Sequence, residues 1–249
     1  MPRVLLDSLR VLVTRPVGEG ADAWAVALRA AGAEPILYPT LIMVPPESWD
    51  ALDEALAKLD DYDLLIFTSQ TTVAVVVDRL PGHRFPVGLR AKIAAVGPAT
   101  EQAIGKAGGK ATLVPSDHRQ EGLVDLLRPL VPGRRVLLPI AAAGRALLAE
   151  SLRAARGFVD VVTAYRTVAK IDNGSPPAFD AAIFASPSAL RAYLAGAGRA
   201  SLAGKVVAVI GATTAEEAQS QGIPAVVASR PDIDAVIHAL ALTRSQGES

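Results

Sequence analysis

The residues of this chain that could do chemistry are mostly small or hydroxylic, and they form five short polar turns. Each turn follows an apolar run of strand length and opens a segment of helical character. Because a helix start presents free backbone N–H groups and the positive end of its dipole, such turns are suited to bind an anion. The alternative is that their Ser and Thr residues only cap helices. The turns are Thr14-Arg15, Ser69-Gln70-Thr71, Gly97-Pro98-Ala99-Thr100, Ser186-Pro187-Ser188 and Gly211-Ala212-Thr213-Thr214.

Two larger side chains are further candidates. Arg15 directly follows an apolar run, and its guanidinium could bind both oxygens of a carboxylate. A surface ion pair is the competing interpretation of Arg15. Tyr165 lies in an extended apolar segment, where its ring could simply pack or could direct its phenol toward a ligand held between two lobes.

The residues of the familiar catalytic sites are missing. The chain has no cysteine, which rules out disulfides, thiolate catalysis and Cys-based metal sites. His83, His118 and His238 have no partner at the spacing of a metal site or a catalytic triad. There is no GxGxxG or Walker motif, so dinucleotide or nucleoside-triphosphate chemistry has no support. We therefore expect no metal and no cofactor.

Charge and hydropathy restrict the partners. The formal net charge is +0, so no strong field attracts nucleic acid or an anionic membrane. No apolar run reaches the roughly 18 residues of a membrane span, and no signal-peptide core is present. We expect a cytoplasmic protein with no nucleic-acid or membrane partner. Nothing in the sequence requires more than a monomer.

The elements that must position these turns alternate along the chain. Apolar strand-length runs are followed by Ala-rich segments of helical periodicity, which is typical of parallel sheets covered by helices. The expected strands are 11–14, 64–68, 93–96, 112–114, 136–139, 181–185, 206–210 and 225–228. The expected helices are 19–31, 49–59, 71–80, 98–107, 120–130, 143–155, 187–195, 214–221 and 232–242.

The chain also repeats itself. Asp63-Leu-Leu-Ile-Phe-Thr-Ser69 recurs as Asp180-Ala-Ala-Ile-Phe-Ala-Ser186, and Lys92–Gly97 recurs as Lys205–Gly211. The run 10–15 has a partner at 135–140. Such a duplication predicts two similar α/β lobes with a cleft between them. Hydrophobic residues make up 51% of the chain, which is enough for two buried sheets.

Two extended segments, near 36–46 and 161–169, interrupt the alternation and suggest crossings between the lobes. Two arrangements fit them. A tandem arrangement would divide the chain near Pro132-Gly133. In an interleaved arrangement, residues 42–164 form one lobe, and residues 1–38 join 170–249 to form the other.

Several motifs in order along residues 10–242 resemble the uroporphyrinogen-III synthase family. They are Thr14-Arg15-Pro16, Ile66-Phe67-Thr68-Ser69, Ala95-Val96-Gly97 with Thr100, Gly144-Arg145 with Leu148, Ala164-Tyr165-Arg166-Thr167, Phe184-Ala185-Ser186-Pro187-Ser188 and Ile210-Gly211-Ala212-Thr213-Thr214-Ala215. Each motif alone is weak, whereas the ordered set is specific.

The resemblance implies the interleaved arrangement, with two flavodoxin-like lobes of parallel sheet joined by a two-stranded antiparallel linker. It implies a lyase (a cyclising hydro-lyase) that converts hydroxymethylbilane to uroporphyrinogen III, with inversion of ring D and loss of water. That step belongs to the biosynthesis of tetrapyrroles such as haem, sirohaem, chlorophyll and cobalamin. Transient contact with hydroxymethylbilane synthase is a further expectation.

The resemblance also implies roles for residues. Tyr165 resembles the cleft tyrosine of the family and would donate a hydrogen bond or proton to the leaving hydroxyl. The turns would bind the substrate's acetate and propionate groups through Thr14, Arg15, Ser69, Gly97, Thr100, Ser186, Ser188, Gly211, Thr213 and Thr214. The main alternative is a non-catalytic two-lobed small-molecule binding protein, and a nucleotide-dependent transferase is a third hypothesis.

Overall fold

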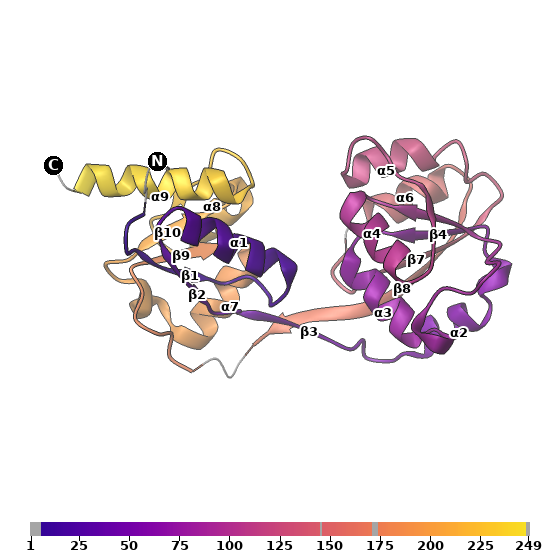
Figure 1. Ribbon diagram of the computed structural model, residues 1–249, viewed down its shortest axis with the longest axis horizontal. Helices are drawn as coiled ribbons and strands as arrows, with labels where there is room; N and C mark the ends of the chain where they lie inside the picture. The colour runs from indigo at the N-terminus through magenta and orange to yellow at the C-terminus, as the bar shows by residue number, and fades with distance from the viewer. Residues whose placement is uncertain (1–5, 145, 171–173, 248–249) are drawn as a thin grey trace. The chain divides into compact units, whose positions relative to one another are not determined.

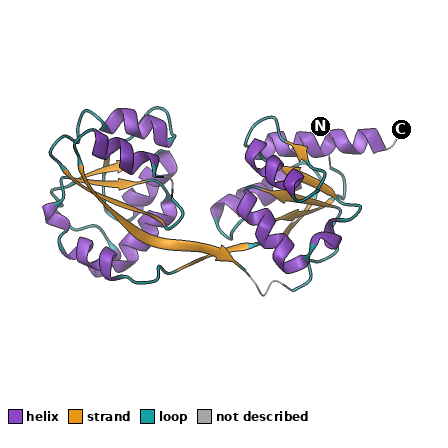
Figure 2. Ribbon diagram, turned by 180° about the vertical axis from the view of Figure 1, so that it is seen from behind, coloured by secondary structure: helices purple, strands orange, loops and turns teal. Residues whose placement is uncertain are grey.

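Two mainly parallel sheets organise the chain, as seen in the computed structural model, which describes residues 6–144, 146–170 and 174–247 (Figures 1 and 2). Two compact units contain them: lobe 1, Met1–Met43 with Val168–Ser249, and lobe 2, Val44–Thr167. The predicted lobe 1 includes residues 1–5, 171–173 and 248–249, which lie outside the described residues, as does Arg145 of the quoted motif.

The sheet of lobe 1 has the strand order β11-β10-β9-β1-β2, with parallel pairing throughout. Its strands are β1 (Arg10–Val13), β2 (Glu34–Leu37), β9 (Ala181–Phe184), β10 (Val206–Val209) and β11 (Val226–Val227). Its helices are α1 (Glu19–Ala30), α7 (Pro187–Ala197), α8 (Ala212–Ser220), α9 (Ile233–Gly247) and the 3₁₀ helix η3 (Arg199–Leu202).

Both faces of this sheet are buried, which explains why its strands are apolar throughout. Val11 and Val13 of β1 pack in one apolar cluster with Trp24 and Leu28 of α1. Leu12, between them, packs in a second cluster on the other face. Successive side chains of a strand point to opposite faces, so helices on both sides require an uninterrupted apolar run.

The sheet of lobe 2 has the strand order β3-β8-β7-β4-β5-β6. Its strands are β3 (Leu41–Val44), β4 (Leu64–Phe67), β5 (Lys92–Ala95), β6 (Ala111–Leu113), β7 (Arg135–Ala141) and β8 (Phe158–Ala169). Its helices are α2 (Asp50–Ala57), α3 (Gln70–Arg79), α4 (Pro98–Lys106), α5 (Gln120–Leu127), α6 (Leu147–Ala154) and the 3₁₀ helices η1 (Leu59–Asp61) and η2 (Pro81–His83). Apolar clusters again lie on both faces of the sheet.

The sequence repeat corresponds to equivalent positions in the two sheets. The order β11-β10-β9-β1-β2 matches β6-β5-β4-β7-β8 strand for strand, so the repeated segments at β4 and β9 both lie at the centre. The aspartate before each central strand also makes the same contact. Asp180 accepts from the backbone N–H of Arg10 at 3.1 Å, and Asp63 accepts from that of Arg135 at 2.9 Å.

The segment near 36–46, expected to be extended, contains two separate strands. Residues Glu34–Leu37 form β2, which pairs with β1 at the edge of the lobe 1 sheet, and β3 begins only at Leu41. Between them Thr40 donates its hydroxyl to the carbonyl of Ala189 at 3.1 Å. The chain is therefore hydrogen-bonded to lobe 1 at Thr40, just before it passes into lobe 2.

The second extended segment is also more than a crossing. Residues 161–169 belong to β8, whose first part pairs with β7 from Phe158 to Tyr165. Its end lies beside the β3 region, where the Lys170 N–H donates to the Thr40 carbonyl at 2.9 Å. Both chain passages between the units, at 43–44 and 167–168, fall within β3 and β8.

Candidate functional site

The polar turns lie at the carboxyl edge of each sheet. In lobe 1, Thr14-Arg15, Ser186–Ser188 and Gly211–Thr214 follow β1, β9 and β10, which are neighbouring parallel strands. In lobe 2, Ser69 follows β4 and Gly97 follows β5, which are also neighbours. Because parallel strands end at the same edge, each lobe gathers its own set of turns where ligands bind open α/β sheets.

Ser69 and Ser186, which begin the turns after β4 and β9, both cap helices. Ser69 Oγ accepts from the Thr72 N–H at 3.1 Å and lies 2.8 Å from Thr72 Oγ1. Ser186 Oγ accepts from the Ala189 N–H at 3.2 Å and lies 3.1 Å from Ser188 Oγ. Ser69 and Ser186 are both partly exposed, so capping does not exclude contact with a ligand.

Three of the threonines in the turns are buried. Thr14 is 0% exposed and donates its hydroxyl to the Ile183 carbonyl at 2.7 Å, which ties β1 to β9. Thr100 is 4% exposed and Thr214 is 3% exposed. Thr213, next to Thr214, is exposed. The hydroxyl available to a ligand in that turn is therefore that of Thr213.

The Gly211 turn is open. A Cβ added at Gly211 would meet no atom within 4 Å, and no side chain caps α8. The first backbone bond of the helix runs from the Ala215 N–H to the Gly211 carbonyl at 3.1 Å. The N–H groups of residues 212–214 precede that bond and point out of the helix start, where they suit an anion.

The equivalent Gly97 turn of lobe 2 is covered. A Cβ at Gly97 would lie 3.1 Å from the Cβ of His118, and Gly97 itself is buried. His118 lies in the loop between β6 and α5, where its Nδ1 is 3.1 Å from the Pro115 carbonyl. Pro98 at the first position of α4 also removes one N–H donor. No local pattern in the sequence links His118 to Gly97, because the two residues meet only through packing.

Arg15 is half-buried at the end of β1, and its guanidinium lies 4.6 Å from the centre of the Trp24 ring. No carboxylate among the described residues pairs with it, so the ion-pair interpretation finds no support in this part of the chain. Burial lowers the pKa of Arg15 below its ordinary value. An uncompensated, partly desolvated cation at this edge is suited to receive an anion.

Tyr165 lies where β8 leaves its regular pairing with β7. The register shifts between Ile140 and Ala141, and the Tyr165 carbonyl accepts from the Ala142 N–H at 2.9 Å. The side chain of Tyr165 is partly exposed, and its phenol has no hydrogen-bond partner among the described residues. Because β7 and β4 are neighbours, Tyr165 shares the carboxyl edge of lobe 2 with Ser69.

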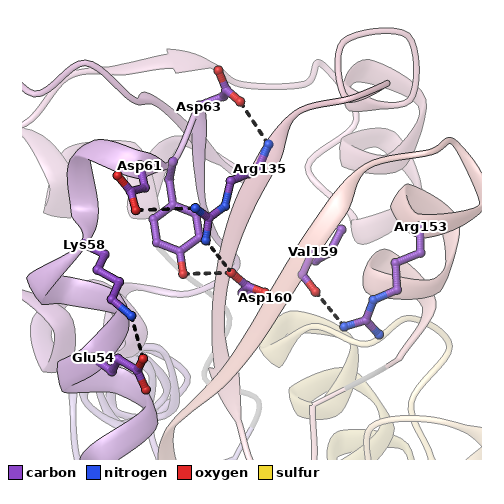
Figure 3. Close-up of polar contacts among 9 residues, drawn as sticks. Glu54, Lys58, Asp61, Asp63, Arg135, Arg153, Val159 and Asp160 are labelled. Carbon is purple, nitrogen blue, oxygen red and sulfur yellow. Dashed lines mark hydrogen bonds and ion pairs between the residues drawn. The ribbon is translucent and has the colours of Figure 1, made fainter.

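The opposite edge of lobe 2 carries a charged cluster that is satisfied internally (Figure 3). Tyr62 donates to Asp160 at 2.9 Å, and burial together with this bond raises the pKa of Tyr62 to about 12. Arg135 lies 3.4 Å from Asp61 and 3.8 Å from Asp160. The adjoining hollow of about 460 Å³ is lined by alanine and valine residues and by charged side chains, and each of these charged groups has a partner within the protein.

Comparison with known proteins gives a consistent result. A family sequence model described as uroporphyrinogen-III synthase HemD matches residues 22–238. A protein named uroporphyrinogen-III synthase from Synechococcus elongatus is 37% identical over 159 residues, which are 63% of this chain and 60% of that relative's own length. A relative from Methanothermobacter thermautotrophicus is 31% identical over 252 residues, covering 95% of this chain and 98% of the relative.

Solved structures show the same fold. The uroporphyrinogen-III synthetase of Helicobacter pylori 26695 has a TM-score of 0.62 and 18% identity, covering 96% of this chain and 99% of that chain. A mutant uroporphyrinogen III synthase from Thermus thermophilus has a TM-score of 0.56 and 17% identity, covering 97% of this chain and 100% of that chain. In the described part of the chain, no helix is long and apolar enough to cross a membrane.

Proposed function

The chain belongs to the uroporphyrinogen-III synthase family, and we propose that it catalyses the reaction for which the family is named. The substrate is the linear tetrapyrrole hydroxymethylbilane. Its cyclisation to uroporphyrinogen III inverts ring D and releases water. The observation that carries the proposal is the match of the family model to residues 22–238, which include the turns at Ser69, Gly97, Ser186 and Gly211.

The chemistry of the turns supports an acidic substrate. Hydroxymethylbilane carries acetate and propionate groups on every ring, yet the formal net charge of the protein is +0. Backbone N–H groups and hydroxyls can hold carboxylates without adding cationic residues. The open Gly211 turn, with the exposed Thr213 beside it, is the best placed of these donors.

The reaction does not depend on a nucleophile from the protein, because the substrate's own pyrrole nitrogen supplies the electrons. Hydroxide leaves the terminal hydroxymethyl carbon as the pyrrole nitrogen lone pair pushes in, which gives an azafulvene cation. Ring D attacks that carbon through its already substituted α-carbon and forms a spiro intermediate. The bond from this α-carbon to the methylene of ring C then breaks and leaves an azafulvene cation on ring C. The other α-carbon of ring D closes onto that methylene, and loss of its proton restores the pyrrole. The protein mainly has to hold the ends of the bilane in this geometry.

Tyr165 is the proposed hydrogen-bond or proton donor to the departing hydroxyl. Its phenol is partly exposed, and no described residue accepts its hydrogen bond. A donor without an internal partner is available to a substrate oxygen. Its position at the register shift of β8 supports this role, because the shift reorients the side chain relative to the regular strand.

The other site residues divide by accessibility. We assign carboxylate binding by side chains to Arg15, Ser69, Ser186, Ser188 and Thr213, and by backbone N–H groups to the open turn at Gly211. The Gly97 turn is covered by His118, so its N–H groups are not assigned to binding. Thr14, Thr100 and Thr214 are buried and act by holding these turns in shape.

The finer architecture is part of the same proposal. The strand order β2-β1-β9-β10-β11 supports a flavodoxin-like lobe 1, and β8-β7-β4-β5-β6 supports its counterpart in lobe 2. In the antiparallel linker proposed here, Thr40 faces Lys170 and Pro45 faces Arg166. We further propose a cytoplasmic monomer that meets hydroxymethylbilane synthase transiently.

Isomer analysis tests the function directly. Hydroxymethylbilane, generated in place by hydroxymethylbilane synthase, closes spontaneously to the uninverted isomer I. Addition of the protein is expected to give isomer III, measured by chromatography of the oxidised porphyrins, with heat-denatured protein as the control. Isomer I alone in the presence of folded protein would refute the proposal. Binding without conversion would instead support the non-catalytic alternative, and a requirement for nucleotide would support the transferase.

A further inference from the structure

We propose that Trp24 and Gly20 are positioning residues that hold the Arg15 guanidinium as a preformed carboxylate receptor at the carboxyl edge of lobe 1. The identity of the carboxylate, an acetate or propionate of the bilane, rests on the proposed function. The receptor itself consists only of residues of the β1–α1 unit. All three residues lie within ten positions of one another along the chain.

Gly20 and Trp24 are four residues apart in α1 and therefore share one face of the helix. Trp24 is 7% exposed and packs in the apolar cluster with Val11 and Val13 of β1. Its ring is thus fixed by the core of the lobe. The Arg15 guanidinium lies 4.6 Å from the ring centre, a distance at which a cation is attracted to an aromatic face.

Gly20 leaves the space that the guanidinium occupies. A Cβ added at Gly20 would lie 3.1 Å from Arg15 Nη2 and 3.6 Å from Cζ and Nε. No atom outside Arg15 is among these nearest contacts. The backbone of Gly20 has no positive φ, so its conformation does not require glycine. A side chain at position 20 would therefore press against the Arg15 guanidinium and no other group among its nearest contacts.

A second arginine–tryptophan pair in the same chain provides a comparison. Arg79 lies 4.3 Å from the Trp49 ring centre, and it also donates Nε and Nη2 to the two carboxylate oxygens of Asp53. That guanidinium is already neutralised within the protein. Arg15 has the same aromatic support but no carboxylate among the described residues. A guanidinium with aromatic support and no internal carboxylate partner is suited to bind an external carboxylate.

The first experiment displaces the guanidinium without disturbing the core. Gly20→Ala forces Arg15 to move by a few tenths of an ångström, and alanine favours helix, so the urea midpoint should stay the same or rise. KM for hydroxymethylbilane should rise about 3- to 10-fold while kcat changes less than about 2-fold. The matched control is Gly196→Ala in α7, where an added Cβ meets nothing within 4 Å. A wild-type KM for Gly20→Ala would overturn the proposal.

The second experiment separates support by the ring from packing. Trp24→Phe keeps an aromatic face and should hold KM within about 3-fold, whereas Trp24→Leu should raise it about 5- to 30-fold. Trp49→Phe is the control and should leave KM unchanged. If Trp24→Leu proves unstable, Gly20→Ala still decides. Equal effects of the Phe and Leu variants would assign Trp24 a packing role only and overturn its place in the receptor.

A binding measurement makes the receptor testable apart from catalysis. In a Trp49→Phe background, Trp24 is the remaining tryptophan, and its emission should change saturably with added tricarballylate at constant ionic strength. The change should disappear in Arg15→Gln. In a Trp24→Phe background, the emission of Trp49 should not respond. A protein that makes no isomer III yet shows this response would refute the proposed function and keep the receptor. Normal isomer III formation with no response would refute the receptor alone.

Discussion

The serines Ser69 and Ser186 occupy equivalent places in the two lobes, and replacing each with alanine separates capping from substrate binding. Both side chains accept a hydrogen bond from a helix N–H, from Thr72 at 3.1 Å and from Ala189 at 3.2 Å. Loss of such a cap costs about 1 kcal/mol of stability. Capping alone therefore predicts a comparable destabilisation of each lobe.

The environments of the two caps make the expected costs unequal. Ser69 Oγ also pairs with Thr72 Oγ1 at 2.8 Å, and Thr72 is 1% exposed, so Ser69→Ala leaves a buried hydroxyl without this partner. An unsatisfied buried hydroxyl adds about 1 kcal/mol. The second partner of Ser186 is Ser188, which is exposed and can turn to water. We expect Ser69→Ala to cost about 2 kcal/mol and Ser186→Ala about 1 kcal/mol.

Urea unfolding measures these costs lobe by lobe. Trp49 belongs to lobe 2 and Trp24 to lobe 1, so each alanine variant is followed in a background that keeps the tryptophan of the same lobe. For substrate binding, the informative variants are Ser69→Gly and Ser186→Gly. Glycine keeps the cap within a few tenths of a kcal/mol but has no hydroxyl. If the hydroxyls bind carboxylates, KM should rise about 5-fold in the glycine variants, since one hydrogen bond is worth about 1 kcal/mol.

Two results would refute this reasoning. Equal stability losses in the two alanine variants would contradict the argument from the burial of Thr72. Glycine variants with a wild-type KM would leave both serines as helix caps and remove them from the proposed site.

Three further predictions concern the Tyr165 phenol, the start of α5 and the amino edge of lobe 1. Tyr165→Phe should lower kcat about 100-fold with little change in the unfolding midpoint. The control Tyr62→Phe should leave kcat unchanged. An unchanged kcat for Tyr165→Phe would refute the proposed role of Tyr165 as a donor. Gly122→Ala should destabilise lobe 2 by about 2 kcal/mol or more, because the new Cβ would overlap the Asp117 carbonyl oxygen. Gly105→Ala, with open space around it, should stabilise lobe 2 by up to about 1 kcal/mol. Urea midpoints that shift in the same direction in both variants would contradict this. Hydrogen bonds from Arg10 lower the pKa of Asp180 to about 2, so its carboxylate stabilises lobe 1 fully above about pH 4 and loses that effect as the pH falls toward 2. The free energy of unfolding of the wild type should therefore exceed that of Asp180→Asn by about 1 kcal/mol at pH 6 and by about half of that at pH 3. An equal difference at the two pH values would refute the linkage.

Local sequence patterns were sufficient to identify most elements. The apolar runs that became β4, β9 and β10 are buried on both faces, so their composition alone distinguishes them from surface strands. Helix starts at Pro98 and Pro187 agree with the structure, because proline at the first position costs no hydrogen bond. The family and the α/β class of fold follow from ordered motifs of this kind, and the comparisons confirm both.

Boundaries that depend on pairing were less predictable. Residues 36–46 read as one extended segment, yet the chain forms β2 in one sheet and β3 in the other. The helix expected at 143–155 begins only at Leu147, and the helix expected at 120–130 ends at Leu127. An apolar extended sequence is compatible with either sheet. The choice depends on which neighbouring strand is available for hydrogen bonds.

The amino-acid sequence by itself determined which residues stand at strand ends and that the two lobes are copies of one unit. The tertiary structure alone decided how those equivalent turns differ. His118 closes the Gly97 turn while the Gly211 turn stays open, and Arg15 lies on Trp24 beside Gly20 with no carboxylate among the described residues. The physical reason is that strand ends follow from local periodicity, whereas access and charge pairing depend on side chains brought together by packing.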